Sequence, residues 1–97
     1  MNNKDTYRYL IGGYYGISEM DEYSTKEYIL KEIRDYIENF INNNYIDFDI
    51  DKEKEDVEKN VSINVKLHDA LLVLPKIDAP IDLILLVKDK IKELNKK

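Results

Sequence analysis

Apolar and polar residues alternate near the start of the chain, with the two-residue period of a β-strand. The segment 7–11, Tyr-Arg-Tyr-Leu-Ile, places two tyrosines and an isoleucine on one side. Gly12-Gly13 can adopt the positive φ angles of a tight turn, after which residues 14–17 would return as a second strand. The pattern predicts a β-hairpin over residues 6–18. The alternative is one strand followed by a glycine-rich loop.

A helical period begins after residue 24. Ser24 and Glu27 have the spacing of a capping box, and Asn residues at 42–44 suit the end of a helix. Arg34 and Glu38 are an oppositely charged pair one turn apart, like Glu27 and Lys31. We expect a helix over residues 25–43. Its apolar stripe consists of Ile29, Ile33, Tyr36, Ile37, Phe40 and Ile41.

Two later segments, residues 45–50 and 61–67, alternate again and predict strands. The charged stretch 51–60 between them is predicted to be an exposed loop. The apolar run Ala70 to Leu74 is either a third, more buried strand or a short buried helix, because periodicity does not separate these two structures. Pro75 ends this run.

The last predicted helix begins near residues 78–80. Asp78 is a suitable N-cap and Pro80 suits the first turn. The elements together predict an α+β fold: a small antiparallel sheet, made of the N-terminal hairpin and two or three further strands, packed against two helices. The predicted core consists of Ile29, Ile33, Ile37, Phe40, Ile46, Phe48, Ile63, Val65, Leu67, Ile84, Val87 and Ile91.

Composition adds limits on the class of protein. A length of 97 residues indicates a single domain, 1–97, and 43% hydrophobic residues are enough for a packed core. The absence of Cys excludes disulfides and thiolate metal sites and fits a reducing compartment. The longest apolar runs have five residues, and the polar N-terminus lacks a signal-peptide core. We expect a cytoplasmic protein.

Charge is unevenly spread over a chain whose formal net charge is −5. Residues 47–58 carry seven acids and two bases, whereas residues 59–97 carry eight bases and five acids. Acidic surfaces repel phosphate backbones and attract basic partners, so direct nucleic-acid binding is not expected. The acidic segment is either a solvated loop or a contact surface for a basic partner protein. The candidate contact residues are Asp47, Asp49, Asp51, Glu53 and Glu55, with Tyr14 and Tyr15 as aromatic anchors.

Neither a metal site nor a catalytic site is expected. The acids of residues 47–58 match part of a calcium-loop template, but Lys52 occupies the position that needs glycine. Gly12 to Gly16 lacks the Lys and Ser/Thr of a phosphate loop. His68 is the only histidine and lies at a predicted turn without a partner for general-base catalysis. We therefore predict no catalytic residue and no cofactor.

Tyrosine is the most frequent aromatic residue: the chain has eight tyrosines, five of them within its first 23 residues. Tyrosine gives a large contact area at low entropic cost, yet it is also a good strand residue. The pattern leaves open whether the tyrosine-rich hairpin is a contact surface or part of the packing. The segment Ile81–Val87 is apolar on nearly all sides and is the candidate interface for a homodimer.

The sequence contains no family motif, and it favours a binding protein over an enzyme. Our leading hypothesis is a small acidic, non-catalytic inhibitor or sequestering protein that docks on a basic surface of a partner protein. By analogy of class, phage anti-defence proteins (an anti-CRISPR-like role) and toxin-immunity proteins have this character. The alternatives are a small homo-oligomer that binds a small ligand in a tyrosine-lined pocket, and an auxiliary structural subunit. A tyrosine-lined pocket would favour the small-ligand alternative, and a convex acidic ridge would favour the inhibitor.

Overall fold

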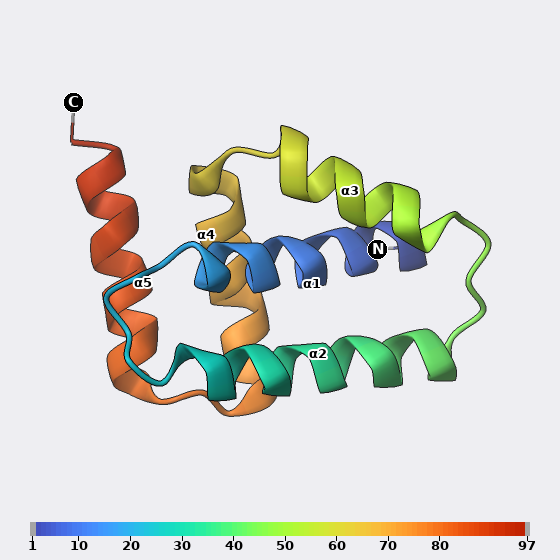
Figure 1. The fold of residues 1–97 in the computed structure, drawn as a ribbon, viewed down its shortest axis with the longest axis horizontal. Helices are drawn as coiled ribbons and strands as arrows, with labels where there is room; N and C mark the ends of the chain where they lie inside the picture. The colour runs from blue at the N-terminus through green and yellow to red at the C-terminus, as the bar shows by residue number, and fades with distance from the viewer. Residues whose placement is uncertain (1, 97) are drawn as a thin grey trace.

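The computed structural model describes residues 2–96, and these residues are helical with no β-strand (Figure 1). The elements are α1 (Asn3–Ser18), α2 (Lys26–Asn43), α3 (Ile50–Asn60), α4 (Ile63–Val73), the 3-10 turn η1 (Leu74–Ile77) and α5 (Ile81–Leu94). Helix α1 lies between α2 and α3, α4 crosses behind α1, and α5 packs beside α4 (Figure 1). Across residues 2–96, no helix combines the length and apolar character that crossing a membrane requires.

The predicted α+β fold is therefore wrong, because the segments expected to form the sheet are helices. The hairpin predicted over 6–18 lies in α1, the loop predicted over 51–60 is α3, and most of the strand predicted over 61–67 is in α4. Residues 44–49, which include most of the other predicted strand, form an irregular connection. The alternation that suggested strands extends over only five to seven residues. A helical stripe of longer range is present in the same segments, and it determines the structure.

The two predicted helices are confirmed, although their starts differ from the expectation. Helix α2 nearly coincides with the predicted range 25–43, but Thr25 is its N-cap and no side chain caps it, so the capping box from Ser24 is wrong. Asp78 is not the N-cap of α5. It ends η1 with a left-handed φ of 52°, and Pro80 precedes the first turn of α5. The run Ala70 to Leu74 is helical, so the helix alternative is confirmed and the strand alternative is wrong.

The closest packing in the molecule is between α1 and α4, and it depends on glycine. All three glycines of the chain, Gly12, Gly13 and Gly16, are buried on the side of α1 that faces α4. A Cβ added at Gly13 would lie 2.7 Å from Cγ2 of Val73, and one at Gly16 would lie 2.7 Å from the carbonyl oxygen of Lys66. These glycines are therefore a contact surface inside a helix, and the predicted turn at Gly12-Gly13 is wrong.

The core is centred on α1 and α4 rather than on a sheet. Of the predicted core residues, Ile29, Ile33, Ile37, Leu67, Val87 and Ile91 are buried. Phe40, Ile46, Phe48, Ile63 and Ile84 are partly buried. Val65 is 49% exposed, so its assignment to the core is wrong. The prediction missed the α1 face, where Tyr7, Leu10 and Ile17 are fully buried, because that face was assigned to a hairpin.

Two lysine side chains hold helix ends in place. Lys26 Nζ donates hydrogen bonds to the carbonyl oxygens of Ser18 (3.0 Å) and Met20 (2.9 Å), at the C-terminal end of α1. Lys66, only 4% exposed, donates to the carbonyl oxygen of Glu58 (2.9 Å) and pairs with the Glu19 carboxylate (3.2 Å). Positive charge at a helix C-terminus is favourable, so both contacts stabilise the arrangement of α1, α2, α3 and α4.

Replacement of Gly16 by alanine should destabilise the fold. The new Cβ would meet backbone atoms of Lys66 and Leu67 that do not move easily. Overpacking costs about 1–3 kcal/mol, and the better helix propensity of alanine offsets about 1 kcal/mol of this loss. Because the clash is with backbone atoms, the overpacking cost lies near the upper end of this range, and we expect the free energy of unfolding to fall by about 2 kcal/mol in urea denaturation. Gly12→Ala is the matched control: its Cβ meets the Asp69 side chain, which can rotate away. Equal stability of Gly16→Ala and the wild type would show that α1 and α4 are not this close.

Candidate functional site

The acidic residues singled out in the sequence do not form a row. Asp47 is exposed in the connection before α3, and Asp49 is the N-cap of α3, where its carboxylate accepts the backbone N–H of Lys52 (3.2 Å). Asp51 is exposed in the first turn of α3. The strand predicted over residues 45–50 would have placed Asp47 and Asp49 on one face. This placement is wrong, because Asp47 lies in an irregular connection and Asp49 caps a helix.

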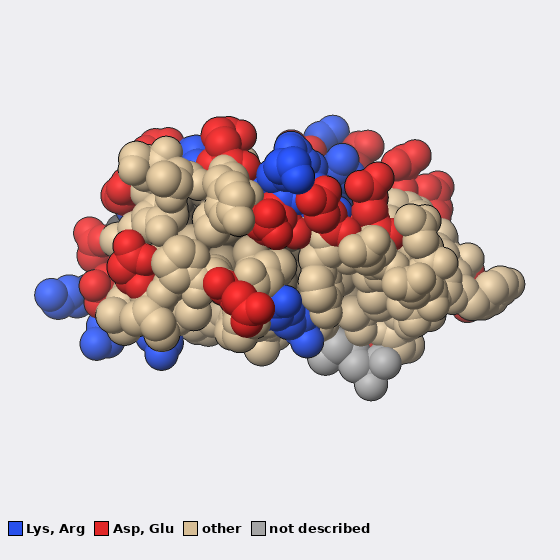
Figure 2. Space-filling view, turned by 90° about the horizontal axis from the view of Figure 1, so that it is seen from below, with Lys and Arg blue, Asp and Glu red and all other residues tan. Residues whose placement is uncertain are grey.

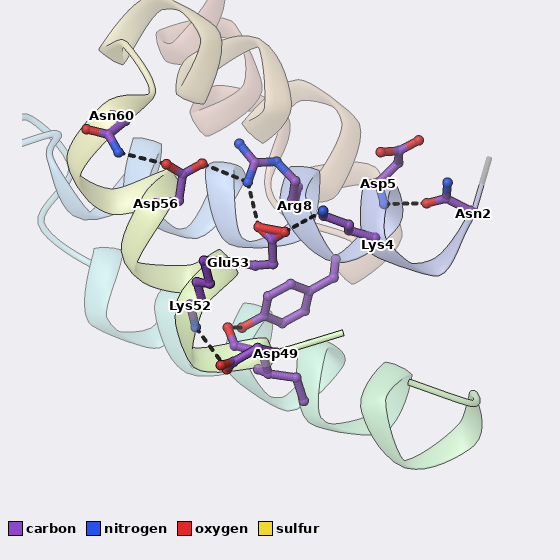
Figure 3. A network of polar contacts seen from close by, with 11 residues as sticks. Asn2, Lys4, Asp5, Arg8, Asp49, Lys52, Glu53, Asp56 and Asn60 are labelled. Carbon is purple, nitrogen blue, oxygen red and sulfur yellow. Dashed lines mark hydrogen bonds and ion pairs between the residues drawn. The ribbon is translucent and has the colours of Figure 1, made fainter. Parts of the chain in front are cut away.

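Two acids of α3 are tied to α1 (Figure 3). The Glu53 carboxylate pairs with Lys4 and with Arg8, each at 2.9 Å, and Arg8 also pairs with Asp56 at 2.9 Å. The Glu53 side chain is only 13% exposed. The hydrogen bond from Lys4 lowers the pKa of Glu53, against the opposing effect of burial, and Arg8 lowers this pKa further. Glu53 thus holds α3 against α1 and is not free for a partner.

The remaining charges of α3 are mixed in sign. Glu55 pairs with Lys59 at 3.1 Å on the exposed side of the helix, and Lys52 and Lys54 lie among the acids. Figure 2 shows the opposite side of the molecule, below α2, where acidic and basic side chains are also mixed. On α3 itself Lys52 and Lys54 lie between the acids and Lys59 pairs with Glu55, so the acidic segment builds no continuous acidic ridge.

The main concave feature described by the structure is a groove of about 720 Å³ along α1. Its floor is one face of α1, and α2 and α3 form its two banks (Figure 1). From α1 the lining residues are Tyr7, Ile11, Tyr14, Tyr15 and Ser18; the apolar bank residues are Ile37, Ile41 and Ile50. Of the predicted contact residues, the groove brings together Tyr14, Tyr15 and Asp51, whereas Asp47, Asp49, Glu53 and Glu55 lie outside it.

The three tyrosines of the groove differ in their roles. Tyr7 is buried, its hydroxyl donates to the carbonyl oxygen of Ile50 (3.3 Å), and burial raises its pKa to about 12. Tyr14 and Tyr15 are half-buried and their rings meet edge to face, with centroids 5.4 Å apart. Burial also raises the pKa of Tyr15, whose ring lies 5.8 Å from Lys66 Nζ. The phenols of Tyr7 and Tyr15 therefore stay neutral near pH 7. Tyr14 and Tyr15 offer ring surface to an occupant of the groove.

The rim of the groove carries charges of both signs. Lys31 and Asp35 pair with each other at 3.1 Å, so the pairing of Lys31 with Glu27 expected from the sequence is wrong. Arg34 lies 3.5 Å from the Tyr14 hydroxyl and forms no ion pair with Glu38. Sequence analysis did not identify Arg34 and Glu38 as lining residues, because their spacing predicted only an ion pair on the outer face of a helix.

Other candidates from the sequence lie outside the groove. His68 is exposed on α4, and its Nδ1 lies 2.8 Å from the carbonyl oxygen of Asn64. Within Ile81–Val87, Leu83 and Val87 are buried, whereas Ile81 and Leu85 are exposed, so only one side of this segment is open to a second copy. Among residues 2–96, no three His, Asp or Glu side chains gather in a way that could hold a metal ion.

A smaller hollow of about 220 Å³ contains a carboxyl group with an unusual pKa. Asp69 of α4 lies there beside Arg8 and Tyr9 of α1 and against Gly12. Burial raises the pKa of Asp69 to about 6, although His68 and Arg8 oppose this shift. Asp69 thus weakens the α1–α4 contact when it is charged.

Comparisons of the chain with protein-family models, with curated proteins and with solved structures found no match. The groove and its charges are therefore the features from which a function can be inferred.

Replacement of Asp69 by asparagine should stabilise the protein at pH 8. The folded state binds the Asp69 proton more tightly than the unfolded state, whose carboxyl has a pKa near 3.8. This contribution to stability is complete below about pH 4 and is lost as the pH rises through about 6. Asparagine does not ionise, so the variant avoids the loss. We expect a gain of about 1 kcal/mol at pH 8, after allowance for solvent screening of a half-exposed group.

The measurement is urea denaturation of the wild type and of Asp69→Asn at pH 4 and pH 8. The stabilities of the two proteins should differ more at pH 8 than at pH 4. A difference that does not change with pH would mean that Asp69 is fully hydrated in the folded state.

Proposed function

We propose that this protein is a non-catalytic binding protein that takes a polypeptide segment of a partner protein into the groove over α1. The observation that carries the proposal is the shape and lining of the groove. Its floor extends from Tyr7 to Ser18, which corresponds to about 16 Å at the rise of an α-helix. This length accommodates about three turns of a helix.

The tyrosines support binding rather than packing alone. Tyr14 and Tyr15 are half-buried in the groove, and each fixes the ring of the other by their edge-to-face contact. Tyrosine rings give a large contact area with few rotatable bonds, so little conformational entropy is lost when a partner binds. The expectation that Tyr14 and Tyr15 are aromatic anchors is kept in this proposal.

The overall charge favours a basic partner. A net charge of −5 attracts positively charged proteins over long range, even though the acids of α3 form no ridge. A small domain that covers a basic partner in this way acts as an inhibitor or a sequestering protein. Residues outside the groove, including Asp47, Asp49 and Glu55, would then contribute to attraction rather than to the contact itself.

The alternative of a small ligand in a tyrosine-lined pocket is less well supported. Small-ligand sites bury most of the ligand surface. Here only residues of α1, α2 and α3 line the groove, as a floor and two banks, and α4 lies behind α1 (Figure 1). A small molecule in such a groove would remain exposed to solvent on one side.

Site-specific photo-crosslinking tests the proposal. A photoreactive phenylalanine analogue replaces Tyr14, in the groove, or Tyr28, which is 66% exposed on α2 and outside the groove. Each variant is exposed to host lysate and irradiated, and the cross-linked products are identified by mass spectrometry. We expect one partner protein to cross-link from position 14 and not from position 28, because only position 14 faces the bound segment.

The same partner should be lost when Tyr15→Ala is added to the position-14 variant, and circular dichroism verifies that this variant remains folded. Cross-linking of the partner from position 28 but not from position 14 would contradict the proposal.

A further inference from the structure

Besides the ion pair between Lys31 and Asp35 on α2, each bank of the groove carries one base and one acid, one helical turn apart. On α2 these are Arg34 and Glu38, and on α3 they are Lys54 and Asp51. Helix α2 runs antiparallel to α1, whereas α3 runs parallel to it (Figure 1). Both acids therefore lie toward the Tyr7 end of the groove, and both bases lie toward the Tyr14 end. The groove is thus electrically polar along its axis.

Within residues 2–96, none of these four side chains forms an ion pair, and Arg34 donates only a hydrogen bond of 3.5 Å to the Tyr14 hydroxyl. By contrast, Lys31 pairs with Asp35, and Glu53 pairs with both Lys4 and Arg8 nearby. The two ends of the groove therefore concentrate charge of opposite sign. An occupant with bases at the Tyr7 end and acids at the Tyr14 end would complement both ends.

The floor favours a helical occupant over an extended one. Tyr14, Tyr15 and Ser18 are the partly exposed residues of the floor and lie within about one helical turn, whereas Tyr7 and Ile11 are buried beneath it. A row of this kind between two flanking helices accepts the ridge of another helix. An extended peptide that binds by strand addition gains its affinity from hydrogen bonds to an open sheet edge. The all-helical chain between residues 2 and 96 has no such edge.

The helix dipole fixes the direction of this occupant. Acidic residues stabilise the first turn of a helix and basic residues stabilise its last turn. A helix that obeys both this rule and the charges of the groove begins at the Tyr14 end and ends at the Tyr7 end. It therefore runs antiparallel to α1.

We infer that the partner's segment is an amphipathic helix of about three turns that lies antiparallel to α1, its acidic first turn beside Arg34 and Lys54 and its basic last turn beside Glu38 and Asp51. This inference rests on the proposed function and names the class of segment that the groove binds.

A designed peptide tests the inference directly. The peptide has about 11 residues, leucines along one helical face, Glu in the first turn, Lys in the last turn and a nitroxide label at its N-terminus. The control peptide has Gln in place of each Glu and Lys. The charged peptide should bind about tenfold more tightly than the control in an anisotropy titration, because several exposed charge pairs add. Its label should broaden the NMR signals of Tyr14 and Ser18, not those of Tyr7.

Charge-swap variants of the protein provide the matched control. The exchange Arg34→Glu with Glu38→Arg keeps the composition of the protein and removes the polarity of the groove, so the charged peptide should lose its preferred direction. The further exchange Asp51→Lys with Lys54→Asp inverts the polarity, and the label should then broaden the signal of Tyr7. If the fourfold variant does not fold, the twofold variant still tests the inference. All of these side chains lie on the rim and not in the core.

Equal binding of the charged and control peptides, or a direction that the swaps leave unchanged, would overturn the inference. A partner that cross-links at position 14 while the designed peptide fails to bind would also overturn it and leave the proposed function standing. Binding of the peptide without any partner at position 14 would instead refute the proposed function.

Discussion

The close approach of α1 and α4 is the constraint on which the rest of the structure depends. Gly13 and Gly16 carry no side chain, so α4 can lie directly against the backbone of α1 and leaves no room for a Cβ atom at either position. Since α4 covers the back of α1, the bulky side chains of α1 are left to the other faces. Tyr7, Leu10 and Ile17 enter the core, and Tyr14 and Tyr15 reach the groove. The groove is therefore a consequence of where the glycines lie.

The sequence predicted α2 because its helical stripe continues through eighteen residues without glycine or proline. It did not predict α1, because Gly12-Gly13 after an alternating segment is also a strong signal for a hairpin turn. Each glycine inside a helix costs about 1 kcal/mol relative to alanine, so local propensity argued against a helix here. Packing against α4 offsets that cost, and contacts between distant segments are not visible in a single sequence.

The candidate site was predicted in part, and the reason differs from residue to residue. Tyr14 and Tyr15 were singled out because clustered tyrosines favour contact surfaces, and both line the groove. Asp51 also lines it, but Asp47 and Asp49 do not, since the row expected for them required a strand. Arg34 and Glu38 were predicted to satisfy each other. Their tertiary position leaves them unpaired on the rim, and the i,i+4 rule takes no account of neighbouring helices.

The acids of α3 separate into two groups with different consequences. Glu53 and Asp56 face inward to Lys4 and Arg8 and hold α3 in place as one bank of the groove (Figure 3). Asp51, on the same helix, is left on the rim with Lys54 one turn away. A net charge alone therefore says little about recognition, because paired charges build the walls and unpaired charges remain to meet a partner. In such a groove the partly exposed rings of Tyr14 and Tyr15 and the apolar side chains of the banks supply most of the affinity, and the charges at its two ends determine the direction in which a partner's segment lies.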